Sequence, residues 1–224
     1  MLRSILMVLG TVCISSLCLA EEGQEALKTE FPEEVLAGTP PDVLALLFPE
    51  LTMPSADLPP LMVPQGTVNL ARHKKVTSSD PNPILGELGY VTDGVKKGSE
   101  EAYVELTIGK QWVQIDLEKT ANIHAVYLWH YFREARGYRA VIVQVSDDKE
   151  FKKNVKTIYN NDTEAEAGMG IGRDRPYIET NRGLRIDAKG VKGRYVRLYS
   201  MGNTANSMNH YVEVEVYGKP AETE

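Results

Sequence analysis

The side chains best suited to binding chemistry lie in two polar stretches of the sequence. The first, HYFREARGY, supplies an imidazole, phenol groups and two guanidinium groups, and the second, GNTANSMNHY, supplies amides and an imidazole. Aromatic faces stack on the C–H patches of a pyranose ring, while arginine, histidine and asparagine side chains hydrogen-bond to its hydroxyl groups. The candidate ligand-binding residues are His130, Tyr131, Arg133 and Arg136 in the first stretch, and Asn203, Asn206, Asn209 and His210 in the second.

Each stretch also has a purely structural interpretation. Arg133 and Arg136 have Glu134 and nearby backbone carbonyls as alternative partners on the surface. Asparagine tolerates the left-handed backbone region and bonds to its own backbone, so an asparagine-rich stretch is also typical of an ordinary turn. The sequence leaves both interpretations open, and it does not decide between Arg133 and Arg136 as the ligand-binding arginine.

Enzymatic motifs are absent from the chain. There is no H-E-x-x-H, G-x-S-x-G or P-loop pattern, and Gly168-x-Gly170-x-Gly172 is followed by residues 173–176, RDRP, which do not open a helix. The four histidines show no metal-ligand spacing. We therefore predict a binding protein that is not an enzyme.

The strands expected to position these stretches have the two-residue period of a half-buried sheet. In residues 111–148, three apolar-alternating runs follow one another, and in WVQIDL the side chains Val113, Ile115 and Leu117 share one face. IHAVYLWHY and AVIVQVS repeat the pattern with β-branched and aromatic residues. Further strands are expected in KKVTSS, AYVELTI, residues 155–159, RPYIETNRGLRID, RYVRLYSM and YVEVEVYG.

The spacing of these strands predicts an all-β jelly-roll sandwich. Glycine, proline and asparagine breaks separate the strands, and residues 160–176 form an acidic and then glycine-rich surface loop. Crossover helices of a parallel α/β fold are missing. In the last strand, residues 212, 214 and 216 are expected to face the core, with Glu213 and Glu215 facing solvent.

The N-terminal part differs from the rest in composition. Residues 1–20 have a basic residue, an apolar run and a small-residue end, which predicts a signal peptide; an uncleaved membrane anchor is the alternative. Both cysteines, Cys13 and Cys18, lie within it, so the mature chain would have no disulfide. We expect a secreted, periplasmic or cell-surface protein.

Residues 21–66 are predicted to be an acidic, proline-rich linker. They contain nine acidic residues, one basic residue and eight of the twelve prolines, a composition that cannot bury enough apolar surface to fold alone. The exception is PDVLALLFPEL, which favours one or two helical turns. These turns would either fold back on the domain or form a short helix that docks a partner.

The net charge of the folded part limits its partners. Residues 67–224 carry 23 lysines and arginines against 22 aspartates and glutamates, so the basic face that phosphate backbones require is missing. Nucleic acid is therefore excluded as the expected partner. The same neutrality disfavours a membrane surface, although Ile84, Leu85, Met169 and Ile171 are apolar residues in loops.

Several motifs occur together in one order: NLARHKKVTSS, TDG, WVQIDLEKTANIHAVYLWHY, VIVQVSDDKEF, GRYVRLYS and HYVEVEVYG. In this order they resemble the coagulation factor 5/8 type C, or discoidin, family, whose relatives include the family 32 carbohydrate-binding modules. The resemblance covers about residues 67–218 and leaves 219–224 as a C-terminal tail. It implies a galactose-binding-like jelly-roll sandwich with ligand-binding loops at one end.

The resemblance also implies a structural calcium ion. The matching positions are Asp93 of TDG, Glu213 on the last strand, and Ser99 where relatives carry threonine or serine. Carboxylates and turn carbonyls suit this hard cation. An ordinary turn residue at Asp93 and a solvent-facing Glu213 are the alternatives, and Lys96-Lys97 with no Thr-x-Trp departs from the family pattern.

The expected function is a secreted, non-catalytic carbohydrate-binding module that recognises a glycan or cell-surface polysaccharide. Galactose binders carry a histidine after a tryptophan in the calcium-side loop; here the nearest aromatic residue is Tyr103, which disfavours a galactose-type ligand. The alternative is a domain of the same fold for cell adhesion, bound to another extracellular protein.

Overall fold

The computed structural model describes residues 23–34, 37–53, 58–97 and 102–221. The signal peptide predicted at 1–20 and the calcium ligand predicted at Ser99 lie outside these residues. The elements are β1 (Gln24–Ala26), α1 (Pro41–Leu47), β2 (Met62–Pro64), β3 (Val68–Asn69), β4 (Val76–Ser78), the 3₁₀ helix η1 (Leu88–Thr92), β5 (Val104–Leu106), β6 (Gln111–Trp129), β7 (Arg136–Gly137), β8 (Ile142–Ser146), β9 (Lys156–Asn160), β10 (Ile178–Glu179), β11 (Leu184–Ser200), β12 (Asn209–Tyr211) and β13 (Glu213–Pro220).

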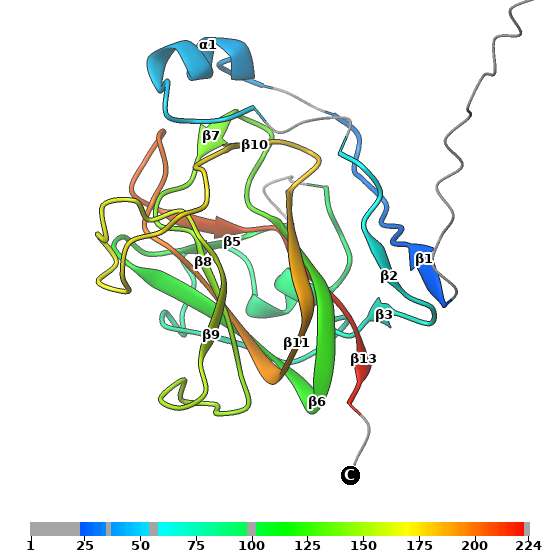
Figure 1. Ribbon diagram of the computed structural model, residues 1–224. Helices are drawn as coiled ribbons and strands as arrows, with labels where there is room; N and C mark the ends of the chain where they lie inside the picture. The colour runs from blue at the N-terminus through cyan, green and yellow to red at the C-terminus, as the bar shows by residue number, and fades with distance from the viewer. Residues whose placement is uncertain (1–22, 35–36, 54–57, 98–101, 222–224) are drawn as a thin grey trace, which may run out of the picture.

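Two long antiparallel strands, β6 and β11, run through the whole molecule (Figure 1). They belong to a sheet of order β3-β13-β6-β11-β8-β9, with β4 beside β6. Their register shifts between Asp187 and Val191 and between Gly193 and Tyr195. Such irregularities bend and twist a strand pair. One end of each long strand therefore lies in one layer of the sandwich and the other end lies in the opposite layer.

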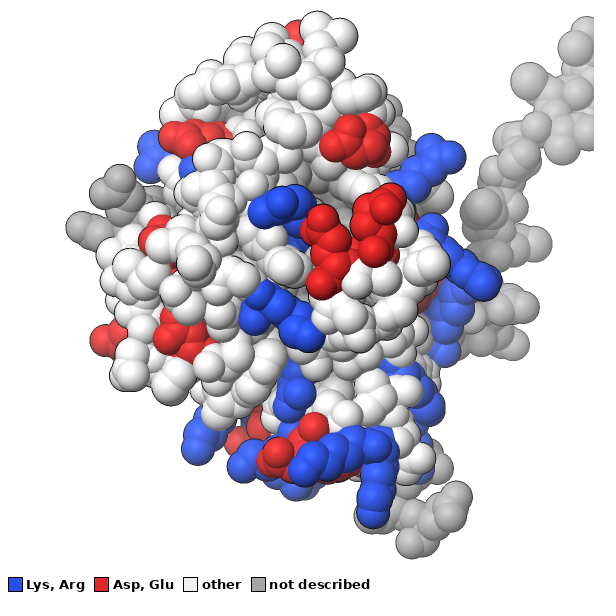
Figure 2. All heavy atoms as spheres, turned by 90° about the vertical axis from the view of Figure 1, so that its left-hand side faces the viewer, with Lys and Arg blue, Asp and Glu red and all other residues white. Residues whose placement is uncertain are grey.

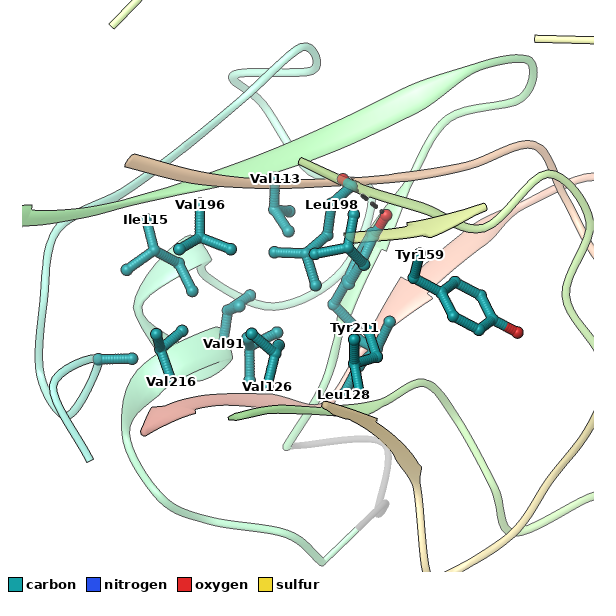
Figure 3. Packing of buried hydrophobic residues seen from close by; sticks show 14 of the residues in the cluster. Val91, Val113, Ile115, Val126, Leu128, Tyr159, Val196, Leu198, Tyr211 and Val216 are labelled. Atoms are coloured by element: carbon teal, nitrogen blue, oxygen red, sulfur yellow. Dashed lines mark hydrogen bonds between the residues drawn. The ribbon is translucent and has the colours of Figure 1, made fainter. Parts of the chain in front are cut away.

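Apolar side chains from both layers fill the space between them (Figure 3). Val113 and Leu198 point inward from one layer, and Val126 and Val216 point toward them from the other. All four are 0% exposed. The period-two pattern of the sequence thus produces the predicted all-β sandwich, since alternate residues on each strand reach the same core.

Two strand predictions need correction. The runs WVQIDL and IHAVYLWHY were expected to be separate strands, but they form the single strand β6. Between the two runs the pairing with β11 shifts its register from Asp116 to Ala121, and Glu118 there adopts a positive φ of 68°. Likewise, RPYIETNRGLRID and RYVRLYSM were expected to be separate strands, but the end of the first and nearly all of the second belong to one strand, β11.

The segment predicted to be a linker is instead packed against the sandwich. We call its described residues, 23–34, 37–53 and 58–66, the N-terminal strap. Its ends pair as β1 and β2, and Thr52 bonds through its N–H to Pro176 O at 2.9 Å and through its carbonyl to Ile178 N at 3.0 Å. Leu44 of α1 is 6% exposed and packs with Ile178. The strap cannot fold alone, but the sandwich offers an apolar surface that its few large side chains cover.

The strap changes which residues of β13 are exposed. Glu213 and Glu215 were expected to face solvent, but they are 0% and 6% exposed. Thr29 of the strap donates to Glu215 at 2.6 Å, and the Lys96 ammonium lies 2.7 Å from Glu215 and 4.3 Å from the centroid of a Trp129 ring. Val212, expected in the central core, packs in this outer cluster with Trp129. The solvent-facing prediction was wrong because the strap covers the outer face of this layer.

The described part of the chain contains no helix with the length and apolarity needed to span a membrane.

Candidate functional site

A cavity of about 580 Å³ lies at the end of the sandwich covered by α1, near β7 and β10 in Figure 1. Four segments meet there: the turn after α1, the chain from β7 to β8, the loop after β9, and the loop between β11 and β12. The lining residues are Phe48, Glu50, Leu51, Gly137, Tyr138, Arg139, Ala140, Asn161, Asp162, Thr163, Glu164, Glu166, Pro176, Asn203, Thr204, Ala205, Asn206 and Ser207. Cavities of this size hold small ligands.

Backbone hydrogen bonds hold the loops around the cavity in place. Thr204 N donates to Gly137 O at 2.9 Å, and Arg139 N donates to Gly202 O at 3.0 Å. The Asn161 side chain accepts from Val141 N at 2.7 Å, which ties the loop after β9 to the same segment. The two stretches singled out in the sequence therefore do lie side by side at one end of the sandwich.

Exposed polar and aromatic groups line the walls of this cavity. Arg139 and Asn206 are exposed, and Phe48 of the strap is half-buried, so its ring has a free part. Figure 2 views this side of the molecule and shows acidic and basic side chains grouped together on it. A ring beside a guanidinium and an amide is a set of groups that can bind a polyhydroxylated ligand.

The predicted arginines do not lie on this cavity. Arg136 is 8% exposed; its guanidinium bonds to Glu134 at 2.6 Å and lies 4.5 Å from the Tyr131 ring centroid. Arg133 is half-buried, and its carbonyl accepts from Ala37 N in the strap. The surface-pair interpretation therefore describes Arg136. The prediction missed this because the sequence does not show which arginine of the stretch is already paired.

His130 is completely buried and cannot contact a ligand. Its Nδ1 lies 3.0 Å from Glu179 Oε2, and its ring stacks on Tyr138 at 4.1 Å between centroids. Tyr177 donates to the same Glu179 oxygen at 3.2 Å. Complete burial lowers the pKa of His130 to about 3 and raises the pKa of Glu179 well above its ordinary value. The pair is therefore neutral, and it supports Tyr138 in the cavity wall from behind.

His210 belongs to the same support. The Tyr138 hydroxyl donates to His210 Nδ1 at 2.9 Å, and His210 Nε2 donates to Glu105 at 3.2 Å. Burial lowers the pKa of His210 to about 3, so the ring is neutral and this donor order follows. The 8%-exposed Tyr103 ring packs 5.6 Å from His210 and 5.0 Å from Tyr131. These predicted ligand-binding residues form a polar and aromatic layer beneath the loops.

Asn203 and Asn209 stabilise the turn of the second stretch, whereas Asn206 is exposed. Asn203 accepts from the backbone N–H groups of Ala205 and Asn206, and buried Asn209 accepts from Gly202 N at 2.9 Å. Asn206 remains exposed on the cavity wall, although its Oδ1 accepts from Met208 N. Asn203 and Asn206 are therefore the predicted residues that the structure brings to the cavity, with Asn206 the exposed one, and Asn209 shapes their loop.

A second polar site lies under the strap at Glu213. Its Oε2 accepts from Gly94 N at 2.9 Å, while its buried Oε1 has no hydrogen-bond partner among the described residues. Burial, helped by the nearby charges of Glu215 and Asp93, raises the pKa of Glu213 to about 9. Gly94 has a φ of +78°, and a side chain there would meet Arg72. The turn therefore needs glycine to aim its N–H at Glu213.

A sequence model of the F5/8 type C domain matches residues 75–214. The chain belongs to the F5/8 type C domain family. The match runs from β4 to the first two residues of β13. It includes both loops that line the cavity from the strands of the sandwich, and it begins after the strap. No curated protein sequence matches the chain.

Solved structures share the fold of this F5/8 type C domain. A family 89 glycoside hydrolase from Clostridium perfringens, in complex with GlcNAc-alpha-1,4-galactose, is 15% identical, with a TM-score of 0.52 over 70% of this chain and 16% of that one. Chitosan-binding module 1 of a chitosanase/glucanase from Paenibacillus sp. IK-5 is 22% identical, with a TM-score of 0.46 over 67% and 99% of the two chains. This chain therefore spans only 16% of the length of the hydrolase, and its similarity to the hydrolase shows a shared fold.

Reasoning from the sequence missed much of the cavity of this F5/8 type C domain. Arg139 lies only three residues beyond Arg136, at the end of the charged break FREARGYR and directly before the run AVIVQVS that was assigned to a strand, and it was not among the candidate residues. Residues 161–166 were correctly expected in a surface loop but not at a site. Phe48 and Glu50 were assigned to a linker. The sequence GYRA, residues 137–140, offered one indication of the position of Arg139. Neighbouring side chains of an extended segment point to opposite sides, so an arginine beside the buried Ala140 is expected to point away from the core.

The residues at the second site fit a cation in this F5/8 type C domain. A buried carboxylate oxygen without a partner, beside the Asp93 carboxylate, is the kind of donor that a hard cation takes. Lys96 already neutralises Glu215, which leaves Glu213 as the carboxylate without a counter-charge. No cluster of three or more histidine, cysteine, aspartate or glutamate side chains suited to a metal occurs in the described ranges. Backbone carbonyls would have to supply the remaining ligands.

Proposed function

We propose that this chain is a non-catalytic glycan-binding module that holds its ligand in the cavity at the α1 end of the sandwich. The observation that carries the proposal is the cavity itself, where the exposed Arg139 and Asn206 side chains lie with the Phe48 ring on walls fixed by backbone hydrogen bonds. Fixed walls favour binding because few groups must be ordered when the ligand arrives. Export, predicted from residues 1–20, is part of this proposal.

Single substitutions test which arginine binds. Arg139→Ala and Phe48→Ala are expected to weaken glycan binding about tenfold each, which corresponds to about 1.4 kcal/mol. Isothermal titration with the best oligosaccharide from a glycan array measures the change. Both side chains are exposed or half-buried, so the melting temperature should change little.

Arg133→Ala is the matched control, because it removes a guanidinium of the neighbouring stretch that does not line the cavity. We expect its affinity to equal that of the wild type. A loss of binding on Arg133→Ala with full binding by Arg139→Ala would move the site to the HYFREARGY stretch and contradict the proposal.

A protein-binding or adhesion domain is the second candidate function. The observation in its favour is the outer face of α1, where Leu46 and Leu47 are 83% and 66% exposed. Exposed leucines next to each other are uncommon on a surface that has no partner. Silence across a glycan array, together with pull-down of an extracellular protein that is lost on Leu46→Ser, would favour this alternative.

We also propose that calcium binds at Asp93 and Glu213. Calcium at ten times its Kd is expected to stabilise the chain by about 1.4 kcal/mol and to raise the melting temperature by about 3–6 °C. Differential scanning fluorimetry with calcium against chelator measures this shift. Asp93→Asn should abolish most of this shift, because the amide lacks the negative charge that attracts calcium. The substitution changes only this charge at a half-buried position, so the fold should be kept. An equal shift in wild type and variant would place the calcium elsewhere.

A further inference from the structure

The charge of the cavity indicates which sugars it can take, an inference that rests on the proposed function. Carboxyl side chains of Glu50, Asp162, Glu164 and Glu166 line it, against the single guanidinium of Arg139. Glu50, Glu164 and Glu166 are exposed, and none of them takes part in a salt bridge within the described ranges. A cleft lined mainly by charges of one sign attracts ligands of the opposite sign.

The carboxylates stand on two different walls of the cavity. Glu50 belongs to the strap, whereas Glu164 and Glu166 belong to the loop after β9. Asp162, only 3% exposed, accepts from the N–H groups of Glu166 and Ala167 at 2.9 and 2.8 Å. Asp162 therefore fixes the turn that carries the two exposed glutamates. A ligand in the cavity would meet negative charge on both sides.

A buried amide gives a second, independent indication of a ligand. Asn161 lines the cavity and is 3% exposed, and its Oδ1 is held by Val141 N at 2.7 Å. Its Nδ2 has no hydrogen-bond partner of normal geometry among the described residues. The amide lies near the Tyr159 hydroxyl and partly offsets the rise that burial causes in the pKa of Tyr159. A buried donor without an acceptor costs free energy, and a ligand hydroxyl oxygen would satisfy it.

We propose that the ligand is an amino sugar with a free, protonated amine, in the form of an oligosaccharide that is not N-acetylated. The amine forms charge-assisted hydrogen bonds with the Glu50 and Glu166 carboxylates. Arg139 and Asn161 donate to the hydroxyl and ring oxygens of the same chain. N-acetylation removes the positive charge that the carboxylates attract, and a uronic acid would bring a second negative charge beside them.

Isothermal titration of the full chain with a glucosamine hexasaccharide, against the N-acetylglucosamine hexasaccharide of the same length, tests this assignment. The free-amine ligand is expected to bind at least tenfold more tightly, with an advantage that shrinks as salt is raised. Glu50→Gln and Glu166→Gln should each reduce the affinity for the free-amine ligand by three- to tenfold and leave the N-acetylated ligand unchanged. Glu150→Gln, an exposed carboxylate away from the cavity, is the matched control and should change neither affinity.

The outcomes separate this inference from the proposed function. If the N-acetylated, neutral or uronic oligosaccharides bind as tightly as the free amine, and Phe48→Ala weakens that binding, the cavity binds glycans but the amino-sugar assignment is wrong. If no oligosaccharide binds at all, the proposed function fails and this inference fails with it. A tenfold preference that survives Glu50→Gln with Glu166→Gln would also overturn the assignment to these carboxylates.

Discussion

Replacing His130 with alanine is expected to lower the free energy of unfolding by about 3–5 kcal/mol. The substitution removes one of the two hydrogen-bond partners of the buried Glu179 carboxyl, leaving Tyr177, and it removes the ring stacked on Tyr138. It also opens a cavity at a position that is 0% exposed. Urea denaturation at pH 7 measures the loss. Glycan affinity should fall as well, because Tyr138 lines the cavity.

Glu179→Gln is the matched variant for the same pair. Burial raises the pKa of Glu179 well above its ordinary value, which favours the neutral carboxyl, and a neutral amide of similar shape replaces it. We expect the free energy of unfolding to stay within about 1 kcal/mol of the wild type. A cost as large as that of His130→Ala would show that the pair is ionic and would contradict the neutral assignment.

The metal-free chain is expected to lose stability as the pH rises from 6.5 to 9. Burial raises the pKa of Glu213 from 4.5 in the unfolded chain to about 9 in the fold. In this range the carboxyl is neutral in the fold but ionised once unfolded, so unfolding releases a proton and rising pH favours it. One such group contributes about 1.4 kcal/mol per pH unit, or about 3 kcal/mol over the range. Glu179 changes stability in the same direction.

The histidines act in the opposite direction at lower pH. Burial lowers the pKa of His130 and His210 from 6.5 to about 3, so both rings are neutral in the fold and take up protons on unfolding below pH 6.5. Their contribution is present above pH 6.5 and is lost as the pH falls toward 3. Between pH 4.5 and 6.5 the glutamates and histidines offset each other. The expected profile therefore has a plateau at mildly acidic pH.

Glu213→Gln isolates the contribution of the second site. The variant has no carboxyl to ionise, so its loss of stability above pH 6.5 should be shallower by about 1.4 kcal/mol per pH unit. Saturating calcium should flatten the wild-type profile in the same way, because calcium holds the carboxylate ionised in the fold. Denaturation midpoints at half-unit steps of pH in chelator measure both effects. An unchanged slope in Glu213→Gln would contradict the raised pKa.

The apolar residues of β6 indicate more than the presence of a strand. In β6, Val126 and Leu128 face the inner core. The opposite face, however, carries Ala125, Tyr127 and Trp129, which are also apolar. A strand that is apolar on both faces needs a cover on both. The strap is that cover, and this surplus of apolar residues was the indication that the strap is not a free linker.

The polar site was harder to predict, because pairing decides which side chains are free. His130, Arg136 and His210 have the types that bind sugars, yet Glu179, Glu134 and Tyr138 respectively occupy their polar groups. Arg139 remains exposed on the cavity, and Phe48 remains half-buried there. Residue type shows what a side chain can do, but its availability depends on neighbours that lie far away in the sequence.

The sequence by itself determined the all-β sandwich and the presence of two polar stretches between its strands. These features follow from a period of two and from turn residues, which act over a few positions. Only the tertiary structure decided that the strap covers β13, that Glu213 and Glu215 are buried, and that the cavity lies beside Arg139. The reason is distance along the chain: Thr29 and Glu215 are 186 residues apart and still share a hydrogen bond. Burial that depends on contacts between residues so far apart leaves no local pattern in the sequence.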